Sequence, residues 1–160
     1  MSEAKKLHLI KCGICVGIII AAFGILSGFI CLARKNWING LKVAAERTLP
    51  EKSGYKVMDF VPIESNLSTS AGCFALGGEA STDGDLIFVV RATTYYGPFP
   101  AVYVYHASNG AAEFIGFYML NSTISKQIVL DGNDSCIKFW KSRCEILAKE
   151  YTASKKELKK

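Results

Sequence analysis

The sequence predicts a single-pass membrane protein of the α+β class, with one transmembrane helix near the N-terminus and one small domain after it. Two observations predict this. Residues 12–33 contain no charged side chain, whereas the rest of the 160-residue chain has the composition of an ordinary soluble domain. In that second part, short apolar runs separated by turn residues come first, and a segment with helical periodicity comes last. This order is typical of a small antiparallel sheet packed by a C-terminal helix.

The apolar segment 12–33 is long enough to cross a bilayer as a helix. At about 1.5 Å of rise per residue, its length covers a hydrocarbon core of about 30 Å. A cleaved signal peptide has a shorter apolar region, whereas here the sequence Arg-Lys-Asn-Trp at 34–37 follows like a stop-transfer and interface anchor. A lipoprotein site at Cys31 is the alternative, but the bulky Ile30 before it disfavours that interpretation.

Basic residues lie on both sides of the apolar segment. Three lysines precede it and three basic residues follow it closely, so the positive-inside rule does not choose an orientation. We expect the short tail 1–11 inside and the domain outside. The formal net charge is +5, and much of it lies beside the apolar segment and at the C-terminus. This distribution favours contacts of the chain ends with anionic lipid head groups, and it gives no basic face for nucleic acid.

Small residues form one face of the predicted transmembrane helix. At about 100° per residue, five of them fall within roughly 80° of one another: Gly13, Gly17, Ala21, Gly24 and Gly28. In a bilayer, such a face lets a second helix approach closely. Glycine is common in transmembrane helices, so chance is the alternative. We predict a partner helix, from a second copy of the chain or from another membrane subunit.

The segment 34–50 is expected to continue as a helical stalk, because apolar residues recur there at helical spacing and Pro50 ends the pattern. The α+β domain is predicted to occupy residues 51–152, and a basic tail, residues 153–160, ends the chain.

Within the domain, alternating and apolar runs predict strands at 55–63, 73–76, 85–92, 101–106 and 112–120, with one more short strand at 128–130. Turn residues separate the strands at 65–70, 77–84 and 108–110, and the aromatic segment 93–100 is expected to form a loop. The last helix is predicted to begin near Asp134. Its apolar face consists of Ile137, Trp140, Cys144, Leu147 and Tyr151.

The six cysteines predict no metal site. The pair Cys12-x-x-Cys15 lies at the membrane boundary and has no second pair, so these residues are interpreted as small hydrophobic side chains. Cys136 and Cys144 are eight residues apart on one helix, about 12 Å along its axis, which is too far for a disulfide. Cys73 can pair with one of them if the domain faces an oxidising compartment.

No catalytic residue is predicted. The sequence contains no Walker loop, Rossmann fingerprint, G-x-S-x-G or H-E-x-x-H pattern. His106 ends a predicted strand and is interpreted as a surface histidine rather than a general base. The loop aromatics Tyr95, Tyr96 and Phe99 either stack on a flat ligand or cap one end of the sheet.

The order of these features also carries a resemblance. A membrane helix and stalk close on Leu49-Pro50, the loop Tyr-Gly-Pro-Phe-Pro at 96–100 leads into a hairpin with Asn109-Gly110 at its turn, and a helix ends the chain. This resembles the membrane-anchored flavin-binding subunits of bacterial ion-pumping electron-transport complexes. They are the G subunit of the Rnf complex and the C subunit of sodium-translocating NADH:quinone reductase.

The resemblance implies a bound flavin mononucleotide (FMN). Family members carry S-G-A-T before the last helix, and its threonine holds FMN through a phosphoester; the same place here reads Asn-Asp-Ser-Cys at 133–136. Family members also carry an E-T-P-G-L-G stretch after the hairpin. At that place this chain has Leu-Asn-Ser-Thr-Ile-Ser, residues 120–125. Ser135 is the residue that would take the phosphate near a helix N-terminus. The alternative is that Ser135 or Asp134 caps the helix.

The resemblance therefore implies an accessory subunit of a membrane ion-translocating electron-transport complex, with an FMN-binding domain or a degenerate form of one. As an enzyme, the chain would be at most an electron-transfer subunit of an oxidoreductase complex. The implied location is the bacterial inner (cytoplasmic) membrane, with the domain on the periplasmic face. The alternative is a non-catalytic, membrane-anchored interaction protein that has lost its cofactor.

Overall fold

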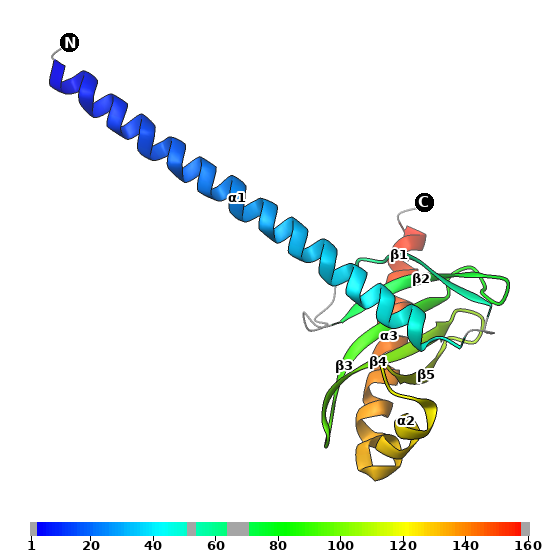
Figure 1. Ribbon diagram of the computed structural model, residues 1–160. Helices are drawn as coiled ribbons and strands as arrows, with labels where there is room; N and C mark the ends of the chain where they lie inside the picture. Colours follow the sequence, from blue (N-terminus) through cyan, green and yellow to red (C-terminus); the bar gives the residue numbers. More distant parts are fainter. Residues whose placement is uncertain (1–2, 51–53, 64–70, 158–160) are drawn as a thin grey trace. The chain divides into compact units, whose positions relative to one another are not determined.

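The computed structural model describes residues 3–50, 54–63 and 71–157 (Figure 1). The chain divides into two compact units, Met1–Trp37 and Ile38–Lys160. Its elements, in chain order, are α1 (Glu3–Thr48), β1 (Tyr55–Phe60), β2 (Gly72–Gly78), β3 (Leu86–Thr94), β4 (Gly97–His106), β5 (Ala111–Phe117), α2 (Ser122–Ile128), the short kinked segment η1 (Val129–Asn133) and α3 (Asp134–Glu157). The predicted α+β class is confirmed.

The first unit consists of the helical residues of α1 that precede Ile38. The large apolar side chains between Ile14 and Leu32 are 54–68% exposed. α1 is the one helix in the described ranges that is long and apolar enough to cross a membrane. The helix continues beyond the predicted span 12–33 in both directions, from Glu3 to Thr48.

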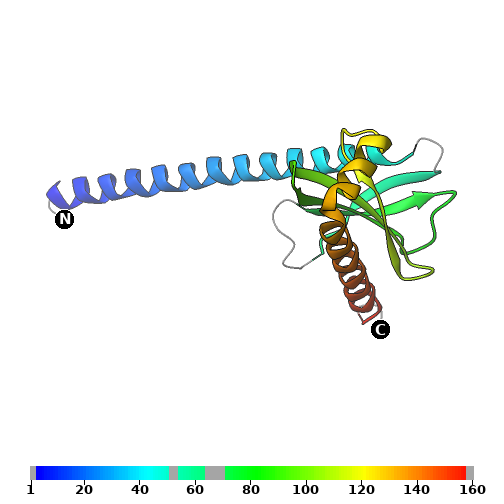
Figure 2. The same ribbon diagram turned by 90° about the horizontal axis from the view of Figure 1, so that it is seen from below.

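The five strands form one antiparallel sheet in the order β1-β2-β3-β4-β5, so each strand pairs with its neighbour in sequence (Figure 2). The longest ladder joins β3 and β4, from Leu86↔Tyr105 to Thr94↔Gly97. Successive side chains of a strand point to opposite faces, and both faces of this sheet are buried. β3 therefore reads as a continuous apolar run, Leu-Ile-Phe-Val-Val, rather than as an alternating one.

One face of the sheet is covered by α3. Phe88 and Tyr103 from the central strands pack there with Cys144 and Leu147 of α3, and all four side chains are almost completely buried. The predicted apolar face of the last helix is thereby confirmed, since Trp140 and Tyr151 also pack against this cluster. The remaining prediction for the chain end, a basic tail from residue 153, overlaps α3, which continues to Glu157.

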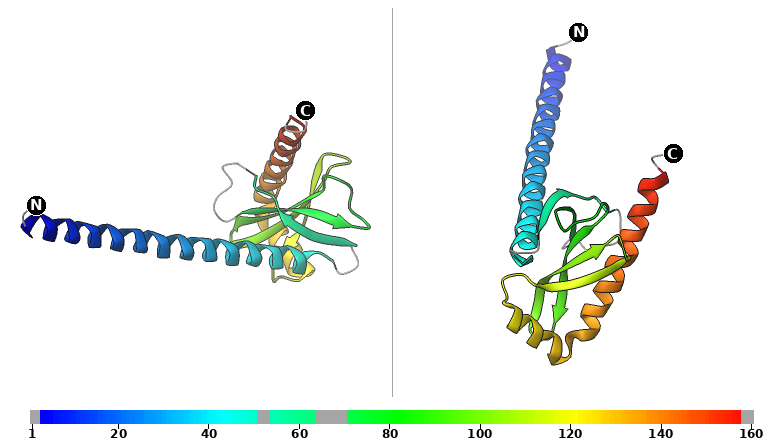
Figure 3. Two further views of the ribbon diagram at one scale, coloured as in Figure 1. Left: turned by 90° about the horizontal axis from the view of Figure 1, so that it is seen from above. Right: turned by 90° about the vertical axis from the view of Figure 1, so that its right-hand side faces the viewer.

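The last turns of α1 cover the other face. Ala44 and Ala45 are buried together with Ile87 and Val102, the strand residues that alternate with those of the α3 side. Figure 3 shows the sheet between these turns and α3. The approach is close at β2, because a Cβ added to Gly72 would lie 2.6 Å from Leu41 Cδ1. The segment predicted as a stalk thus contributes to the core of the domain from Ile38 onward.

The prediction of a loop at 93–100 is wrong. β3 and β4 continue through it and meet in a two-residue turn at Tyr95-Tyr96. Proline is rare inside strands because it lacks an N–H for the ladder. Pro98 and Pro100 nevertheless lie inside β4. The carbonyl of Pro100 accepts from Tyr118 N, so the nitrogens of both prolines point to the β5 side. The ladder with β3 therefore loses no hydrogen bond, and β5 pairs with β4 only from Ala101 onward.

The strand predicted at 128–130 is also wrong, because this run belongs to α2 and η1. Asn121 begins α2 by accepting a hydrogen bond from Ile124 N at 2.8 Å. By its pattern alone, the short apolar run at 128–130 fits a strand or a helix equally well. The helix cap at Asn121 favours the helix. Similarly, the strand predicted at 112–120 ends at Phe117. The polar turn expected at 65–70 lies outside the described residues.

Candidate functional site

Ser135, the predicted FMN attachment residue, is exposed in the first turn of α3. Asp134 directly before it pairs with Lys138 one turn later. Asp131 lies four residues before Ser135 and accepts hydrogen bonds from Tyr96 and Gln127. Ser135 is therefore accessible, and two carboxylates precede it closely in the chain.

These surroundings do not fit a flavin phosphate. A phosphate on Ser135 would add negative charge close to Asp134, while Lys138, one turn later on the same helix, is already paired with Asp134. Neither of the two pockets described below includes Ser135, so neither offers the flavin ring a cavity beside the attachment point.

The aromatic residues singled out in the sequence have structural contacts. Phe99 packs on Phe117 in the core, with ring centroids 5.8 Å apart. The β3–β4 turn is fastened to the corner before α3, where Asn133 Oδ1 accepts from Tyr95 N at 2.9 Å and Asp131 accepts from the Tyr96 hydroxyl at 2.6 Å. The latter hydrogen bond raises the pKa of the Tyr96 phenol. Of the two roles considered, packing at one end of the sheet is the one these contacts support.

The three cysteines of the domain are free thiols. Cys73 and Cys144 are buried in the cluster between the sheet and α3, whereas Cys136 is half-buried. Burial, together with the nearby Cys144, raises the pKa of Cys73 well above its ordinary value. Burial and Glu145 raise the pKa of Cys144 to about 12. Both groups are therefore protonated at neutral pH and are poor nucleophiles.

His106 ends β4, as expected, and its side chain is 23% exposed. Its ring nitrogens lie 4.0 Å from Asp85 and 3.7 Å from Glu113. Asp85 was not singled out by the sequence, although it is the buried member of this group. It accepts hydrogen bonds from Thr82 and from Ala107 N and so joins two loops of the sheet.

Buried polar residues in the described ranges all take part in holding the fold. Asp85 binds two loops, and Asn133 binds the β3–β4 turn. Thr94 donates to Gly97 O within the turn, and Ser125 Oγ accepts from Phe117 N at the end of β5. These contacts assign a structural role to each of the four. No group of three or more His, Cys, Asp or Glu residues suited to a metal ion occurs in the part of the chain that the structure describes.

A pocket of about 680 Å³ lies where the end of α1, the end of β5 and the start of α2 meet. We call it the β5 pocket. Segments 47–50 and 115–120, with Ser122 and Ser125, line it. Gly116 is part of the lining, and a Cβ added there would lie 3.7 Å from Thr48 Cγ2 and 3.8 Å from Ser125 Oγ. The missing side chain of Gly116 therefore leaves room between these two residues.

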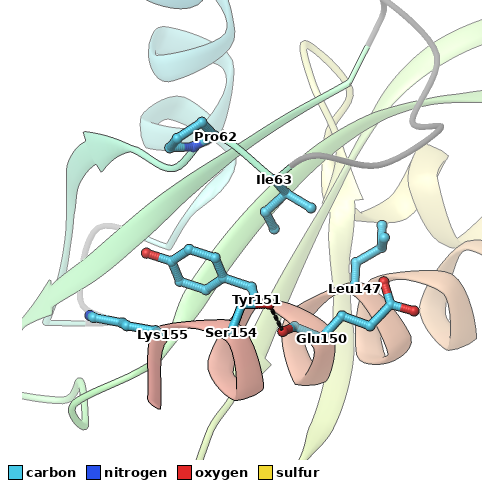
Figure 4. Close-up of a pocket in the computed structure, with 7 residues that line it drawn as sticks. All are labelled: Pro62, Ile63, Leu147, Glu150, Tyr151, Ser154 and Lys155. Atoms are coloured by element: carbon cyan, nitrogen blue, oxygen red, sulfur yellow. Dashed lines mark hydrogen bonds between the residues drawn. The ribbon is translucent and has the colours of Figure 1, made fainter. Parts of the chain in front are cut away.

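A second pocket, of about 520 Å³, lies between Ile63 and the C-terminal half of α3. Figure 4 shows Ile63 directed toward the side chains of α3, with Leu147 and Tyr151 among them. Glu150 and Lys155 add one charge of each sign, and the Ser154 hydroxyl donates a hydrogen bond to the Glu150 carbonyl. The described lining of this pocket, which we call the α3 groove, is mainly apolar and has no net charge.

The similarity of this chain to a known family lies in its domain. A family model described as "Uncharacterised protein" matches residues 44–154. The chain belongs to this family. Neither a curated protein nor a solved structure matches the chain. The family match begins in the last turn of α1, covers the whole sheet and includes every residue that lines the β5 pocket.

Proposed function

We propose that this protein is a non-catalytic, single-pass membrane subunit, in which α1 anchors the chain and binds a partner helix while the domain serves as a binding module. The observation that carries the proposal is the exposure of the large apolar side chains from Ile14 to Leu32, each more than half exposed. Such a surface in water would cost free energy roughly in proportion to its area, about 25 cal/mol per Å². A lipid environment removes this cost.

The small-residue face gives α1 a surface for a partner. Nothing lies within 4 Å of a Cβ added to Gly13, Gly17, Gly24 or Gly28. In lipid, van der Waals contact between closely approaching backbones stabilises helix pairs, and a larger side chain on this face prevents the approach. The partner is a second copy or another membrane subunit.

The partner helix is tested by combining Gly17→Leu with Gly24→Leu in the full chain. We expect a complex that is stable in mild detergent to dissociate, as seen by size-exclusion chromatography with light scattering. Ala22→Leu is the matched control, since it enlarges a small residue on the opposite side of the helix. Unchanged association in the double variant, or equal loss in the control, would count against the glycine face.

The buried polar groups of the domain favour a non-catalytic role, because each of the four described ones makes a hydrogen bond within the fold. For the location, we propose the bacterial inner membrane with the domain on the periplasmic side. A C-terminal alkaline phosphatase fusion tests the side, since this reporter is active only outside the cytoplasm. An inactive fusion, together with a fluorescent cytoplasmic reporter at the same position, would reverse the orientation.

Electron transfer through FMN is the more specific function that the family resemblance implies, and it stays a prediction. The test is to denature the purified protein, made in cells with intact flavin-transfer machinery, and to look for in-gel fluorescence and a flavin-phosphate mass increment. From the charges around Ser135 we expect neither signal. A flavin increment that disappears in Ser135→Ala would overturn the non-catalytic proposal and restore the electron-transfer function.

A further inference from the structure

We propose that the β5 pocket binds a small carboxylic acid with an apolar tail. The inference concerns the domain alone and does not rest on the proposed membrane function. At about 680 Å³, the pocket is within the usual size range of small-molecule sites. Its lining combines one cation, several hydroxyl groups and an apolar floor, and no acidic residue is among the described side chains that form it.

The charged end of the ligand is indicated by Arg47. Its side chain lines the pocket from the last turn of α1 and is exposed. No described residue forms an ion pair or hydrogen bond with its guanidinium group. A guanidinium group presents a fork of donors that matches a carboxylate in two parallel hydrogen bonds. Among the described residues, Arg47 therefore has no counter-charge, and it lies beside the pocket.

Ser125 adds a donor deeper in the pocket. Its side chain is buried, at 5% exposure, and its oxygen accepts the hydrogen bond from Phe117 N at 3.4 Å. Within the described ranges, no residue accepts the hydrogen of the Ser125 hydroxyl. A buried donor without an acceptor costs free energy, and an oxygen atom of a ligand would satisfy it. Ser122, one turn earlier, places a second hydroxyl on the same lining.

The apolar end of the ligand is indicated by the rest of the lining. Apolar residues make up much of that lining, among them Leu49, Ile115, Phe117 and Leu120. Burying an aliphatic chain against such side chains contributes about 0.8 kcal/mol per CH₂ group. Met119, at the rim, has a φ of +64° and an 81% exposed side chain. This backbone conformation is uncommon for a residue other than glycine, and it turns the chain between β5 and α2 around the pocket.

The probe is hexanoate, added to the full chain in phosphatidylcholine nanodiscs and followed by saturation-transfer difference NMR. Acetate carries the charge without the tail, and hexanol carries the tail without the charge. We expect saturable binding of hexanoate, at least tenfold tighter than binding of either comparison molecule. Equal binding of acetate or hexanol, or no saturable binding of hexanoate, would overturn the assignment.

Variants locate the site. Arg47→Gln should weaken hexanoate binding at least tenfold, because a charge-assisted hydrogen bond is lost, and Gly116→Ala should weaken it by filling the cavity at ordinary contact distances. Arg91→Gln is the control, because Arg91 is an exposed arginine on β3 outside the pocket. An effect of Arg91→Gln equal to that of Arg47→Gln would contradict the site.

A second nanodisc composition separates a free acid from a lipid. If phosphatidylglycerol in the disc abolishes hexanoate binding that phosphatidylcholine permits, an anionic lipid head group takes the pocket, and the assignment to a free acid is overturned. Hexanoate binding that is equal in both discs supports a free acid.

Discussion

Asp85 is expected to be the polar residue on which the stability of the sheet most depends. Its side chain is 2% exposed. One carboxylate oxygen accepts from Thr82 N at 2.9 Å, and the other accepts from the Thr82 hydroxyl at 2.8 Å and from Ala107 N at 2.7 Å. The bonds join the β2–β3 loop to the β4–β5 loop. Replacing the residue therefore loosens two connections at once.

The substitution Asp85→Asn keeps the shape but exchanges one acceptor oxygen for an NH₂ group. The amide oxygen can still accept from Ala107 N, while the NH₂ group faces Thr82 N–H, which loses its acceptor. A hydrogen bond to a charged group contributes about 1.5–3 kcal/mol. We therefore expect the free energy of unfolding to fall by about 2 kcal/mol, and by more in Asp85→Ala.

Acid should remove the difference between the two proteins. Burial alone would raise the pKa of Asp85, but the hydrogen bonds from Thr82 and Ala107, with the nearby His106, outweigh it and lower the pKa below its ordinary value. A lowered pKa in the folded state means that the stabilisation is complete above the unfolded-state value of about 3.9. It is lost as the pH falls through the folded-state value. The asparagine variant lacks this dependence.

The assay is urea unfolding of the full chain in detergent, followed by near-UV circular dichroism at several pH values. Asp83→Asn is the matched control, since Asp83 is an exposed carboxylate in the same turn, and its effect should stay within about 0.5 kcal/mol. A loss below about 0.5 kcal/mol for Asp85→Asn, or a loss that does not shrink in acid, would refute the reasoning.

Three further predictions concern the core and the turns. Leu147→Ala should lower the free energy of unfolding by about 2–5 kcal/mol, because Leu147 is fully buried against the sheet; the same substitution at Ile146, which is 46% exposed, should cost less than about 1 kcal/mol, and equal losses would contradict this packing. Gly78→Ala should cost at least about 2 kcal/mol, because its φ is +108° and the new Cβ would lie 2.1 Å from Gly54 O; the effect should exceed that of Gly97→Ala, which has φ +116° and open space. Peptide mass mapping after alkylation at pH 8 should show Cys144 reacting at least about 100-fold more slowly than the half-buried Cys136 in the folded protein; equal rates would refute the burial of Cys144.

The main elements of the fold could be predicted because their signals are strong and local. The uncharged run 12–33 and the apolar run 86–90 are continuous, and the helix after Asp134 has a clear helical periodicity. The errors lie where a distant contact decides. Pro98 and Pro100 fit a strand because β5 ends beside them. Similarly, Ala44 and Ala45 are buried because they cover the second face of the sheet. The sequence does not show which segment covers that face.

The candidate site was less predictable. The β5 pocket joins residues 47–50 to residues 115–125, which are far apart in the chain and form no motif. Two local signals were available. A glycine within an apolar strand, here Gly116, often marks open space or close approach, and Asn121 before a polar turn indicates a helix start. Neither signal identifies Arg47 as a neighbour, because its position depends on how the end of α1 packs on the sheet.

The central claim is that α1 spans a bilayer, and the most direct measurement is the intact mass of the chain after membranes are washed with alkaline carbonate. We predict that the protein stays in the membrane pellet and that its mass includes residues 12–33. Release into the supernatant, or a mature chain that begins after Ala33, would contradict the account.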